Sequence, residues 1–340
     1  MTSNTPQFWY APKSRISRFL TAILRPLAMI YSAGDKINQS FDVTNAVDIP
    51  VICVGNLNIG GAGKTPVCIT LSKILVDDAG FLSPVFLTRG YGGNILGPEF
   101  VDTSNNAAIW GDEPLLLNKH ARTVVSRNRY QGAKLASQTG ADIVIMDDGL
   151  QNKTLEKTIT LVVVDGTYGF GNQQTIPAGP LRRPLEQGLN AADAFIIMGE
   201  DNYGIKGLIP KDKPVFSAKT KVKAGWKVDK KKKYVSFCGI AHPAKFEASL
   251  KDRGLDIEKS LSFPDHHVFT DTDMEKLSSI SEKLDAQLIT TEKDYVRLPD
   301  STFKSNVMTL PVEAYFTAKE KKALCTFIQK NINDKLLKGA

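Results

Sequence analysis

The chain has 340 residues, of which 42% are hydrophobic and 23% are charged, an ordinary composition for a soluble globular protein. This length is enough to bury one large core or two smaller ones. No uninterrupted run of about 18 apolar residues occurs, so the sequence predicts no conventional membrane-spanning helix. The four cysteines (Cys53, Cys68, Cys238 and Cys325) lack metal-ligand spacing, and a reducing compartment is the simpler interpretation.

The net charge of +7 is concentrated in two stretches. Residues 211–233 hold ten lysines and two aspartates, and residues 1–34 hold four basic residues and no acidic one. The rest of the chain is net negative, so the charge indicates two basic patches rather than a protein that coats nucleic acid. We interpret the lysine-rich stretch as a solvated boundary or an exposed hairpin, outside the core.

The N-terminus combines an aromatic cluster, Phe8 to Tyr10, with a basic and apolar segment that extends to about Tyr31. Its apolar residues recur at helical spacing from Phe19 to Ile30, and Pro26 is expected to kink or divide the helix. This combination favours a helix that lies in a membrane interface. A helix packed on its own domain and a weak signal peptide are the alternatives, although the apolar part is short for a signal peptide.

From residue 48 onward, apolar strand-like runs alternate with helical patterns such as Leu71–Val76 and Tyr130–Ser137. Such alternation predicts an α/β fold with a mostly parallel sheet and helices on both faces, and ligands at the carboxyl ends of the strands. A second, smaller α/β unit is expected after the lysine-rich stretch. The predicted strands are Val51–Val54, Val85–Thr88, Thr123–Ser126, Ile143–Met146, Leu161–Val164 and Phe195–Met198, followed by Tyr234–Gly239, Leu288–Thr291 and Val307–Leu310.

Residues 54–66, VGNLNIGGAGKTP, form the most informative motif of the chain. A strand, a glycine-rich loop, a Lys-Thr pair and a helix follow one another, as in the phosphate-binding loop of nucleoside-triphosphate enzymes. Asn58 stands where the strict spacing has a glycine, but asparagine tolerates left-handed backbone. The glycines let backbone N–H groups approach phosphates, the lysine neutralises charge, and the threonine hydroxyl holds Mg²⁺. The predicted nucleotide-binding residues are Gly60, Gly61, Ala62, Gly63, Lys64 and Thr65.

Two pairs of acidic residues are candidates for metal binding or catalysis. Asp147 and Asp148 end a buried strand, and beside a phosphate loop an acid in that place holds Mg²⁺. Without the upstream loop, they would be read as a polar turn. Asp112 and Glu113 open a helix, where they could be helix-dipole partners, metal ligands, or groups that face an acceptor hydroxyl.

Histidines and arginines supply the remaining candidates. The segment FPDHH at 263–267 lacks a third soft ligand, so a zinc site is not expected. His266 could tune a general base on the other domain, or it could be a surface histidine. The rigid loop PAGPLRRP at 177–184 presents Arg182, which suits an anionic group, and Arg127 follows another strand end.

Together these blocks resemble the tetraacyldisaccharide 4'-kinase family, the ATP-dependent kinases of lipid A biosynthesis. The resemblance spans almost the whole chain, in the expected order. Its most specific parts are the glycine loop with Asn56 and Pro66, DDGLQ and FPDHH, and Asn58 is no departure within this family. The matching segments are the N-terminal helix, GNLNIGGAGKTP at 55–66, TRGYGG at 88–93, GDEP at 111–114, DDGLQ at 147–151, PAGPLR at 177–182, FPDHH at 263–267 and TTEKDYVRL at 290–298.

The resemblance implies ATP and Mg²⁺ as cofactors and two α/β domains with a cleft and a mobile linkage. Lys64 and Thr65 would bind ATP phosphates and Mg²⁺, and Glu113, Asp147 and Asp148 would lie near the metal. Asp112 with His266 would act as the base on the acceptor hydroxyl. Arg182 and Arg127 would face an anionic acylated disaccharide, and the N-terminal helix would rest peripherally on the cytoplasmic face of the bacterial inner membrane. The resemblance assigns no role to Lys293 and Asp294.

From these features we expect an N-terminal interface helix over residues 1–34, a kinase domain over 35–215 and a smaller domain over 216–340. The expected reaction is phosphorylation of the 4'-hydroxyl of a tetraacylated glucosamine disaccharide 1-phosphate. Two alternatives remain at this point: a phosphate-loop switch or ATPase whose lysine stretch grips nucleic acid, and a soluble small-molecule kinase. The lysine stretch lacks interleaved aromatic residues, so nucleic acid is not expected as a partner.

Overall fold

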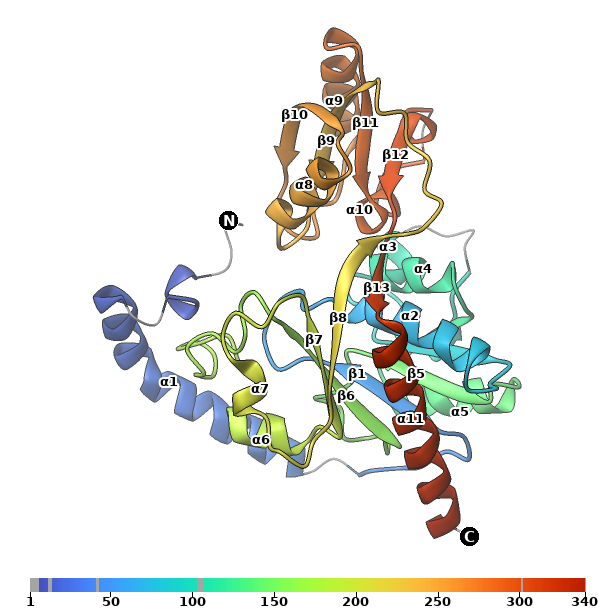
Figure 1. Cartoon of the computed structure of the whole chain (residues 1–340). Coiled ribbons are helices and arrows are strands. Elements are labelled where there is room, and N and C mark those ends of the chain that lie inside the picture. The colour runs from blue at the N-terminus through green and yellow to red at the C-terminus, as the bar shows by residue number, and fades with distance from the viewer. Residues whose placement is uncertain (1–5, 12–13, 41–42, 103–106, 301, 340) are drawn as a thin grey trace.

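The computed structural model describes residues 6–339 except 12–13, 41–42, 103–106 and 301. A larger body is built on one sheet, and a smaller body with its own sheet sits on it (Figure 1). This arrangement confirms the predicted α/β class with a second, smaller α/β unit.

The larger sheet has the strand order β13-β8-β7-β6-β1-β5-β2-β4-β3. Its inner strands are parallel, and the two edge strands β3 and β13 are antiparallel to their neighbours. The central strands are wholly buried, as expected when helices cover both faces of a parallel sheet. The strands are β1 (Val51–Gly55), β2 (Pro84–Thr88), β3 (Glu99–Phe100), β4 (Thr123–Val125), β5 (Ile143–Asp147), β6 (Ile159–Asp165), β7 (Ala194–Met198), β8 (Val215–Val222) and β13 (Val312–Phe316).

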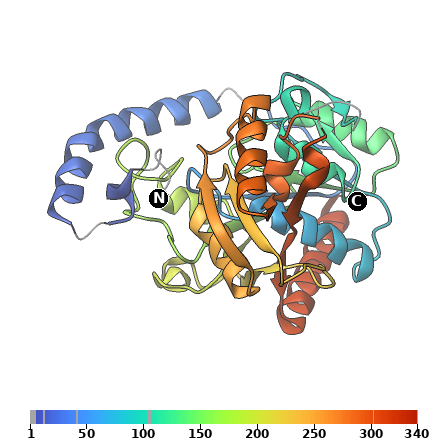
Figure 2. The same ribbon diagram turned by 90° about the horizontal axis from the view of Figure 1, so that it is seen from above.

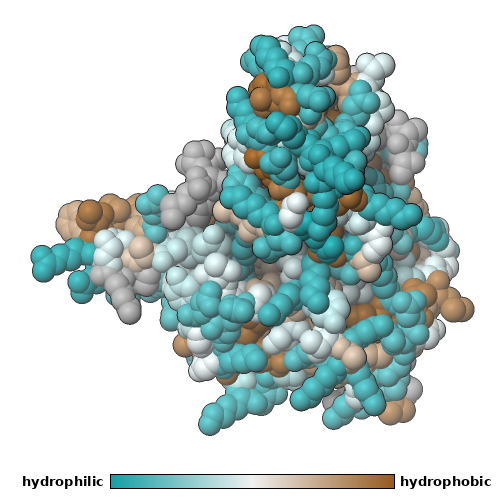
Figure 3. Space-filling view, turned by 45° about the horizontal axis from the view of Figure 1, so that its top comes forward, coloured by the Kyte–Doolittle hydropathy of each residue, from teal (hydrophilic) through white to brown (hydrophobic). Residues whose placement is uncertain are grey.

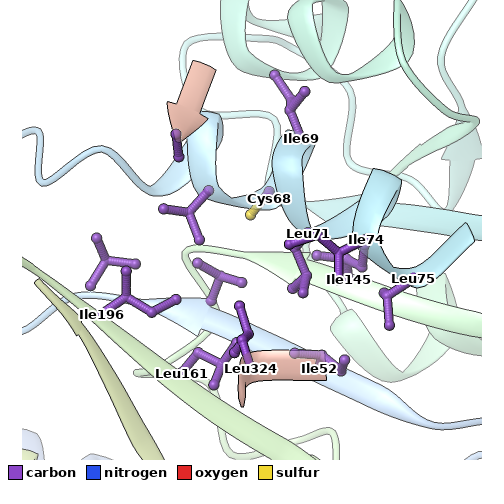
Figure 4. Close-up of a cluster of buried hydrophobic side chains, with 14 of the residues drawn as sticks. Ile52, Cys68, Ile69, Leu71, Ile74, Leu75, Ile145, Leu161, Ile196 and Leu324 are labelled. Carbon is purple, nitrogen blue, oxygen red and sulfur yellow. The ribbon is translucent and has the colours of Figure 1, made fainter. Parts of the chain in front are cut away.

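Helices cover both faces of this sheet. Helices α2 and α11 share a core with one face, α5 with part of the opposite face, and α6 and α7 with the rest of it. Figure 4 shows the first of these cores, where Leu71 and Ile74 of α2 lie against Ile145 and Ile52 of the sheet. The helices are α1 (Arg15–Ser40), α2 (Lys64–Asp77), α3 (Ala107–Trp110), α4 (Asp112–Asn118), α5 (Arg129–Gln138), α6 (Leu185–Asn190), α7 (Ile205–Leu208) and α11 (Ala318–Gly339), with a 3₁₀ turn η1 (Gln7–Trp9).

The smaller body is a parallel four-stranded sheet with the order β10-β9-β11-β12. Helix α8 packs on one face and α9 on the other. Its elements are β9 (Lys233–Cys238), α8 (Pro243–Asp252), β10 (Asp256–Ser262), α9 (Asp271–Lys283), β11 (Ala286–Thr291), α10 (Glu292–Tyr295), η2 (Lys304–Asn306) and β12 (Val307–Leu310).

The boundary predicted at residue 216 differs from the way the strands pair. β8 continues the larger sheet beside β7, and β13 pairs with β8 after the chain returns from the smaller body. Residues 223–311 are therefore an insertion between two strands of the larger sheet, and α11 packs back on α2 (Figure 1). Strand pairing between distant segments decides this boundary, and local patterning does not reveal it.

The lysine-rich stretch is partly core, contrary to its interpretation as an exposed boundary. Phe216 and Ala218 of β8 are buried in the core with α11, whereas Lys219 and Lys221 are exposed. Beyond β8, the chain crosses to the smaller body, and this part does form the expected connector.

Helix α1 runs without interruption across Pro26, so the predicted division does not occur. It lies along one side of the larger body and projects from it (Figure 2). Among the described helices, none is both long and apolar enough to cross a membrane.

Candidate active site

The loop of residues 56–63 leaves β1 at the centre of the larger sheet and leads directly into α2. Gly60 and Gly63 have positive φ angles of 114° and 86°, which favour glycine. Gly63 caps α2, so the first N–H groups of the helix open toward this loop. The predicted nucleotide-binding residues thus form one continuous loop and helix start, suited to phosphates.

Asn56 braces the phosphate loop from inside. Its side-chain amide donates to the Gly60 carbonyl oxygen at 3.1 Å, and its Oδ1 accepts from Lys64 Nζ at 3.2 Å. Asn56 is buried, so these bonds are shielded from water. The amide keeps the loop curved and holds the lysine at its mouth.

Asp147 lies at the end of β5 beside Thr65. The Thr65 hydroxyl donates to Asp147 Oδ2 at 3.0 Å, while Oδ1 is buried without a hydrogen-bond partner among the described residues. Burial, followed by the charge of Glu113, raises the pKa of Asp147 to about 7. An orphaned carboxylate oxygen next to a threonine hydroxyl fits Mg²⁺, which binds few protein ligands together with water and phosphate oxygens. Within the described residues, no three His, Cys, Asp or Glu side chains form a metal site by themselves.

Asp147→Asn should raise the melting temperature of the metal-free protein by several degrees at pH 8. A native pKa of about 7, above the ordinary value of 3.8 for an aspartate, means that ionisation of Asp147 destabilises the fold. This penalty is absent below pH 4, grows between pH 4 and pH 7, and is complete above pH 7. Its size is on the order of a few kcal/mol. Thermal melts in a chelator from pH 5 to pH 8 measure the difference between the variant and the wild type. A difference that does not change with pH would contradict the raised pKa.

Asp148 is held by two cations, Lys64 and Arg182. Its φ of 53° is in the left-handed region, and its carboxylate forms a bidentate pair with Arg182 at 3.0 to 3.2 Å. Lys64 Nζ lies 3.6 Å away. Although burial raises its pKa, Lys64 and Arg182 lower it more, so Asp148 is ionised. Arg182, which the sequence placed against the lipid, therefore has Asp148 as its partner in this structure.

Asp112 and His266 meet across the two bodies. Asp112 begins α4, is only 3% exposed, and has its Oδ2 3.2 Å from Nδ1 of His266. His266 lies on the loop between β10 and α9, with a positive φ of 58°. The structure thus brings together the two residues that the resemblance predicted as a pair.

Lys293 of α10 defines the tautomer of His266. Its Nζ lies 3.3 Å from Nε2 of the ring, and an ammonium group only donates hydrogen bonds. Burial alone would lower the pKa of Lys293, but Glu113 and Asp112 raise it overall, so the group is an ammonium. Nε2 is therefore the accepting nitrogen, and Nδ1 carries the proton that faces Asp112.

The same lysine links this pair to Glu113, one of the predicted metal ligands. Lys293 Nζ lies 3.3 Å from Glu113 Oε1 and 3.7 Å from Asp112 Oδ2. Burial would raise the pKa of Asp112, yet the hydrogen bond from His266 and the charges of Lys293 and Arg297 lower it to about 2. Asp112 is thus a carboxylate at any working pH. Glu113 connects the pair to Asp147, because it forms an ion pair with Lys293 and its charge raises the pKa of Asp147.

Arg127 remains the more open of the two predicted substrate arginines. It is exposed, and its guanidinium has no hydrogen bond or ion pair within the described part of the chain. Arg129, two residues on, is instead buried and donates to the Ser126 carbonyl oxygen. Arg127 can accept an anionic partner without breaking an internal contact.

Comparisons with known proteins agree with this geometry. The family described as Tetraacyldisaccharide-1-P 4'-kinase matches residues 20–333. The chain belongs to this family. A tetraacyldisaccharide 4'-kinase of Paramagnetospirillum magneticum is 45% identical over 90% of this chain and 93% of its own, and one of Rhodospirillum centenum is 41% identical over 90% and 91%.

A solved structure of the 4'-kinase family has the same fold. LpxK from Aquifex aeolicus, crystallised in complex with ATP, aligns with a TM-score of 0.74 at 25% identity, covering 92% of this chain and 99% of its own. The 4'-kinase fold thus extends over both bodies of the chain.

Sequence reasoning missed several residues of this 4'-kinase site. Lys293 and Arg297 stand in a motif that was recognised without a role, and Asn56 was noted only as typical of the family. Lys293 and Arg297 have partners from other segments, whereas Asn56 bonds within the phosphate loop to Gly60 and Lys64. Their signal in the sequence was their place in a family motif, because spacing alone does not reveal which groups they contact.

Proposed function

We propose that the protein transfers the γ-phosphoryl group of ATP to the 4'-hydroxyl of a tetraacylated glucosamine disaccharide 1-phosphate, in lipid A biosynthesis. The observation that carries this proposal is the Asp112–His266 pair, which the two bodies bring together next to Lys293 and Glu113. A phosphate loop alone serves many reactions, whereas a carboxylate-held imidazole supplies the base that an alcohol acceptor needs.

The chain's own residues then have distinct tasks. Asp112 holds Nδ1–H of His266 and stabilises the imidazolium that forms when Nε2 takes the hydroxyl proton. Lys293 covers Nε2 in the present structure, so it must give way when the acceptor enters. Lys64 neutralises charge on the transferring phosphoryl group, and the loop amides orient the phosphates.

Thr65 and Asp147 would hold Mg²⁺, with Glu113 and Asp148 beside them. When bound, Mg²⁺ supplies charge neutralisation on the phosphate oxygens. Asp148, already paired with Arg182, would act mainly by fixing Lys64.

The direct test is to incubate the purified protein with γ-labelled ATP, Mg²⁺ and a detergent-dispersed tetraacylated disaccharide 1-phosphate. We expect label in the lipid, with no transfer when the 4'-hydroxyl is blocked. Label released only as inorganic phosphate would contradict the kinase assignment.

The nucleic-acid alternative finds no support in the lysine-rich stretch. Several of its lysines have partners within the protein. Lys223 pairs with Glu292 at 2.9 Å, Lys233 pairs with Glu258 at 2.7 Å, and Lys221 lies over the ring of Tyr315. Charges that are already paired neutralise few phosphates.

The acceptor's 1-phosphate needs a cationic partner, and we propose Arg127 for it. The family resemblance implies Arg182 as well, but its bidentate pair with Asp148 occupies the guanidinium. Arg182 would contact the lipid only if its guanidinium bound the lipid phosphate and the Asp148 carboxylate at the same time.

We also propose that α1 places the protein peripherally on the cytoplasmic face of the inner membrane. The side of α1 that faces the larger body is small and polar: Ser17 and Ala28 are buried, and Thr21 and Ser32 contact Asn172 and Thr175. The opposite side is apolar and open, and it forms the brown projection in Figure 3. Its residues are Ile16, Phe19, Ile23, Leu27 and Ile30, each more than half exposed. An apolar face turned outward, with Arg18 and Arg25 nearby, suits an anionic membrane surface.

Changing Ile16, Phe19 and Ile23 together to serine should reduce binding to anionic vesicles by about 10³-fold or more, since each large apolar side chain contributes on the order of 1.5–3 kcal/mol when buried. ATP binding should stay within about twofold, because this face contacts no part of the phosphate loop. Vesicle flotation and ATP titration measure the two effects.

The control is Leu82→Ser with Leu337→Ser, which removes two apolar side chains elsewhere on the surface that are even more exposed than those of α1. This control should bind vesicles like the wild type. If the α1 variant and the control bound anionic vesicles equally well, the apolar face of α1 would not be the membrane contact.

A further inference from the structure

The motif TTEKDYVRL contains an arginine, Arg297, that the reaction described above does not use. Arg297 follows α10 in the smaller body, and its side chain is only 6% exposed. Its guanidinium donates to the carbonyl oxygens of Gly239 at 2.9 Å and His267 at 3.2 Å, and it pairs with Asp294 at 2.5 Å. Its Nε lies 3.5 Å from Oδ2 of Asp112, on the larger body. One buried cation therefore contacts four chain segments.

These partners surround His266 on both sides. The backbone N–H of His266 donates to the Gly239 carbonyl oxygen, the same atom that accepts from Arg297. The carbonyl of the next residue, His267, also accepts from Arg297. Because His266 has a positive φ, which costs a non-glycine residue about 1 kcal/mol or more, the surrounding contacts must hold it in place.

Asp294 completes the clamp. It is fully buried, and its Oδ1 accepts the Gly239 N–H at 3.0 Å while the guanidinium binds the carbonyl of the same residue. A side chain at position 239 would meet the Pro264 carbonyl oxygen at 2.9 Å and Cβ of His267 at 3.2 Å, so only glycine permits this close approach. The clamp and the glycine fix the loop that carries His266 against the segment that directly follows the end of β9.

We propose that Arg297 is a positioning residue that holds the His266 loop in register with Asp112, so that the two form the base only when the smaller body is seated on the larger one. This inference rests on the proposed kinase function. The role requires arginine, because its planar fork donates in several directions at once, whereas a lysine ammonium on a longer, flexible stem cannot reach Gly239, His267 and Asp112 together.

The test compares Arg297→Lys with the wild type and with Arg253→Lys, a control on the smaller body whose guanidinium binds the Val222 carbonyl oxygen, away from His266. Arg297→Lys keeps the charge beside Asp294 and Asp112, which favours folding. We expect its single-turnover rate to fall by about 100-fold, as for a small misplacement of a catalytic group, with ATP affinity within about twofold. The control should keep the wild-type rate.

A double-mutant cycle separates positioning from a general loss of stability. In a His266→Ala background, Arg297→Lys should slow transfer less than about threefold further, because it acts through the missing imidazole. Losses that multiply in full, or an Arg297→Lys rate close to wild type, would overturn the proposal.

A second readout does not depend on transfer. In ¹⁵N-histidine-labelled protein, the ring signals of His266 should leave the pattern of the Nδ1–H tautomer in Arg297→Lys, while those of His120 stay unchanged. Unchanged His266 signals would also overturn the proposal. If the wild type transfers no phosphoryl group to the lipid but the ring signals shift, the kinase function fails while the positioning role stands.

Discussion

Asp112→Ala and His266→Ala should each slow phosphoryl transfer by about 10³-fold, and the double variant should be little slower than either single one. The two residues act as one base: Nδ1 of His266 lies 3.2 Å from Oδ2 of Asp112, and this contact orients the ring so that Nε2 can accept. Removing either partner disables the same device, so the losses overlap instead of adding. Single-turnover rates with saturating ATP and lipid measure the effect.

The electrostatics make each half of this pair dependent on the other. Asp112, with a pKa of about 2, is too weak a base to take a hydroxyl proton efficiently by itself at neutral pH. Without Asp112, the imidazole loses the carboxylate that stabilises its charged form. His267→Ala is the matched control, because His267 pairs with Asp273 and stacks on Phe263, away from Asp112. Losses that multiply in the double variant would refute a shared base.

The sequence was most informative where consecutive residues share one task. The segment 54–66 contains a strand, a phosphate loop and a helix start, so local patterning was enough to predict both the structure and its ligand. The central strands were also predictable, because parallel strands buried on both faces read as continuous apolar runs. In the same way, Asp147 was predicted from its place at a strand end.

The parts that depend on distant pairing were not predictable from patterning. β8 carries lysines and reads as a solvated connector, yet its Phe216 and Ala218 enter the core because β13 returns to pair with it. Lys293 and Glu113 are 180 positions apart, and no spacing rule brings them together. The Asp112–His266 pair came from the family resemblance for the same reason.

The sequence also did not predict which anion the Arg182 side chain contacts. A rigid loop with Arg182 suggested contact with an anionic lipid, but the backbone turn at Asp148 gives that arginine an internal carboxylate. The sequence showed that a guanidinium was available, while the fold determined which anion it meets.

Lys64→Ala should reduce phosphoryl transfer by about 10³-fold or more while leaving the fold intact. Nζ of Lys64 lies at the mouth of the phosphate loop, held by Asn56 at 3.2 Å and near Asp148 at 3.6 Å, where its charge meets the transferring phosphoryl group. Removing it leaves Asp148 paired, because that carboxylate keeps its bidentate pair with Arg182. The melting temperature should therefore change by only a few degrees.

The control for this prediction is Lys73→Ala on the same helix. Lys73 is about half exposed and lies 3.9 Å from Glu313, far along α2 from the phosphate loop, so its loss should leave transfer unchanged. Labelled-lipid formation in single-turnover reactions measures both variants, and a thermal melt confirms that each is folded. Both substitutions remove one lysine charge from α2. A difference in transfer rate between them therefore reports where the charge lies, and not the loss of a positive charge as such. Near-normal transfer by a folded Lys64→Ala variant would show that the glycine loop does not carry the reaction, and the kinase assignment would fall with it.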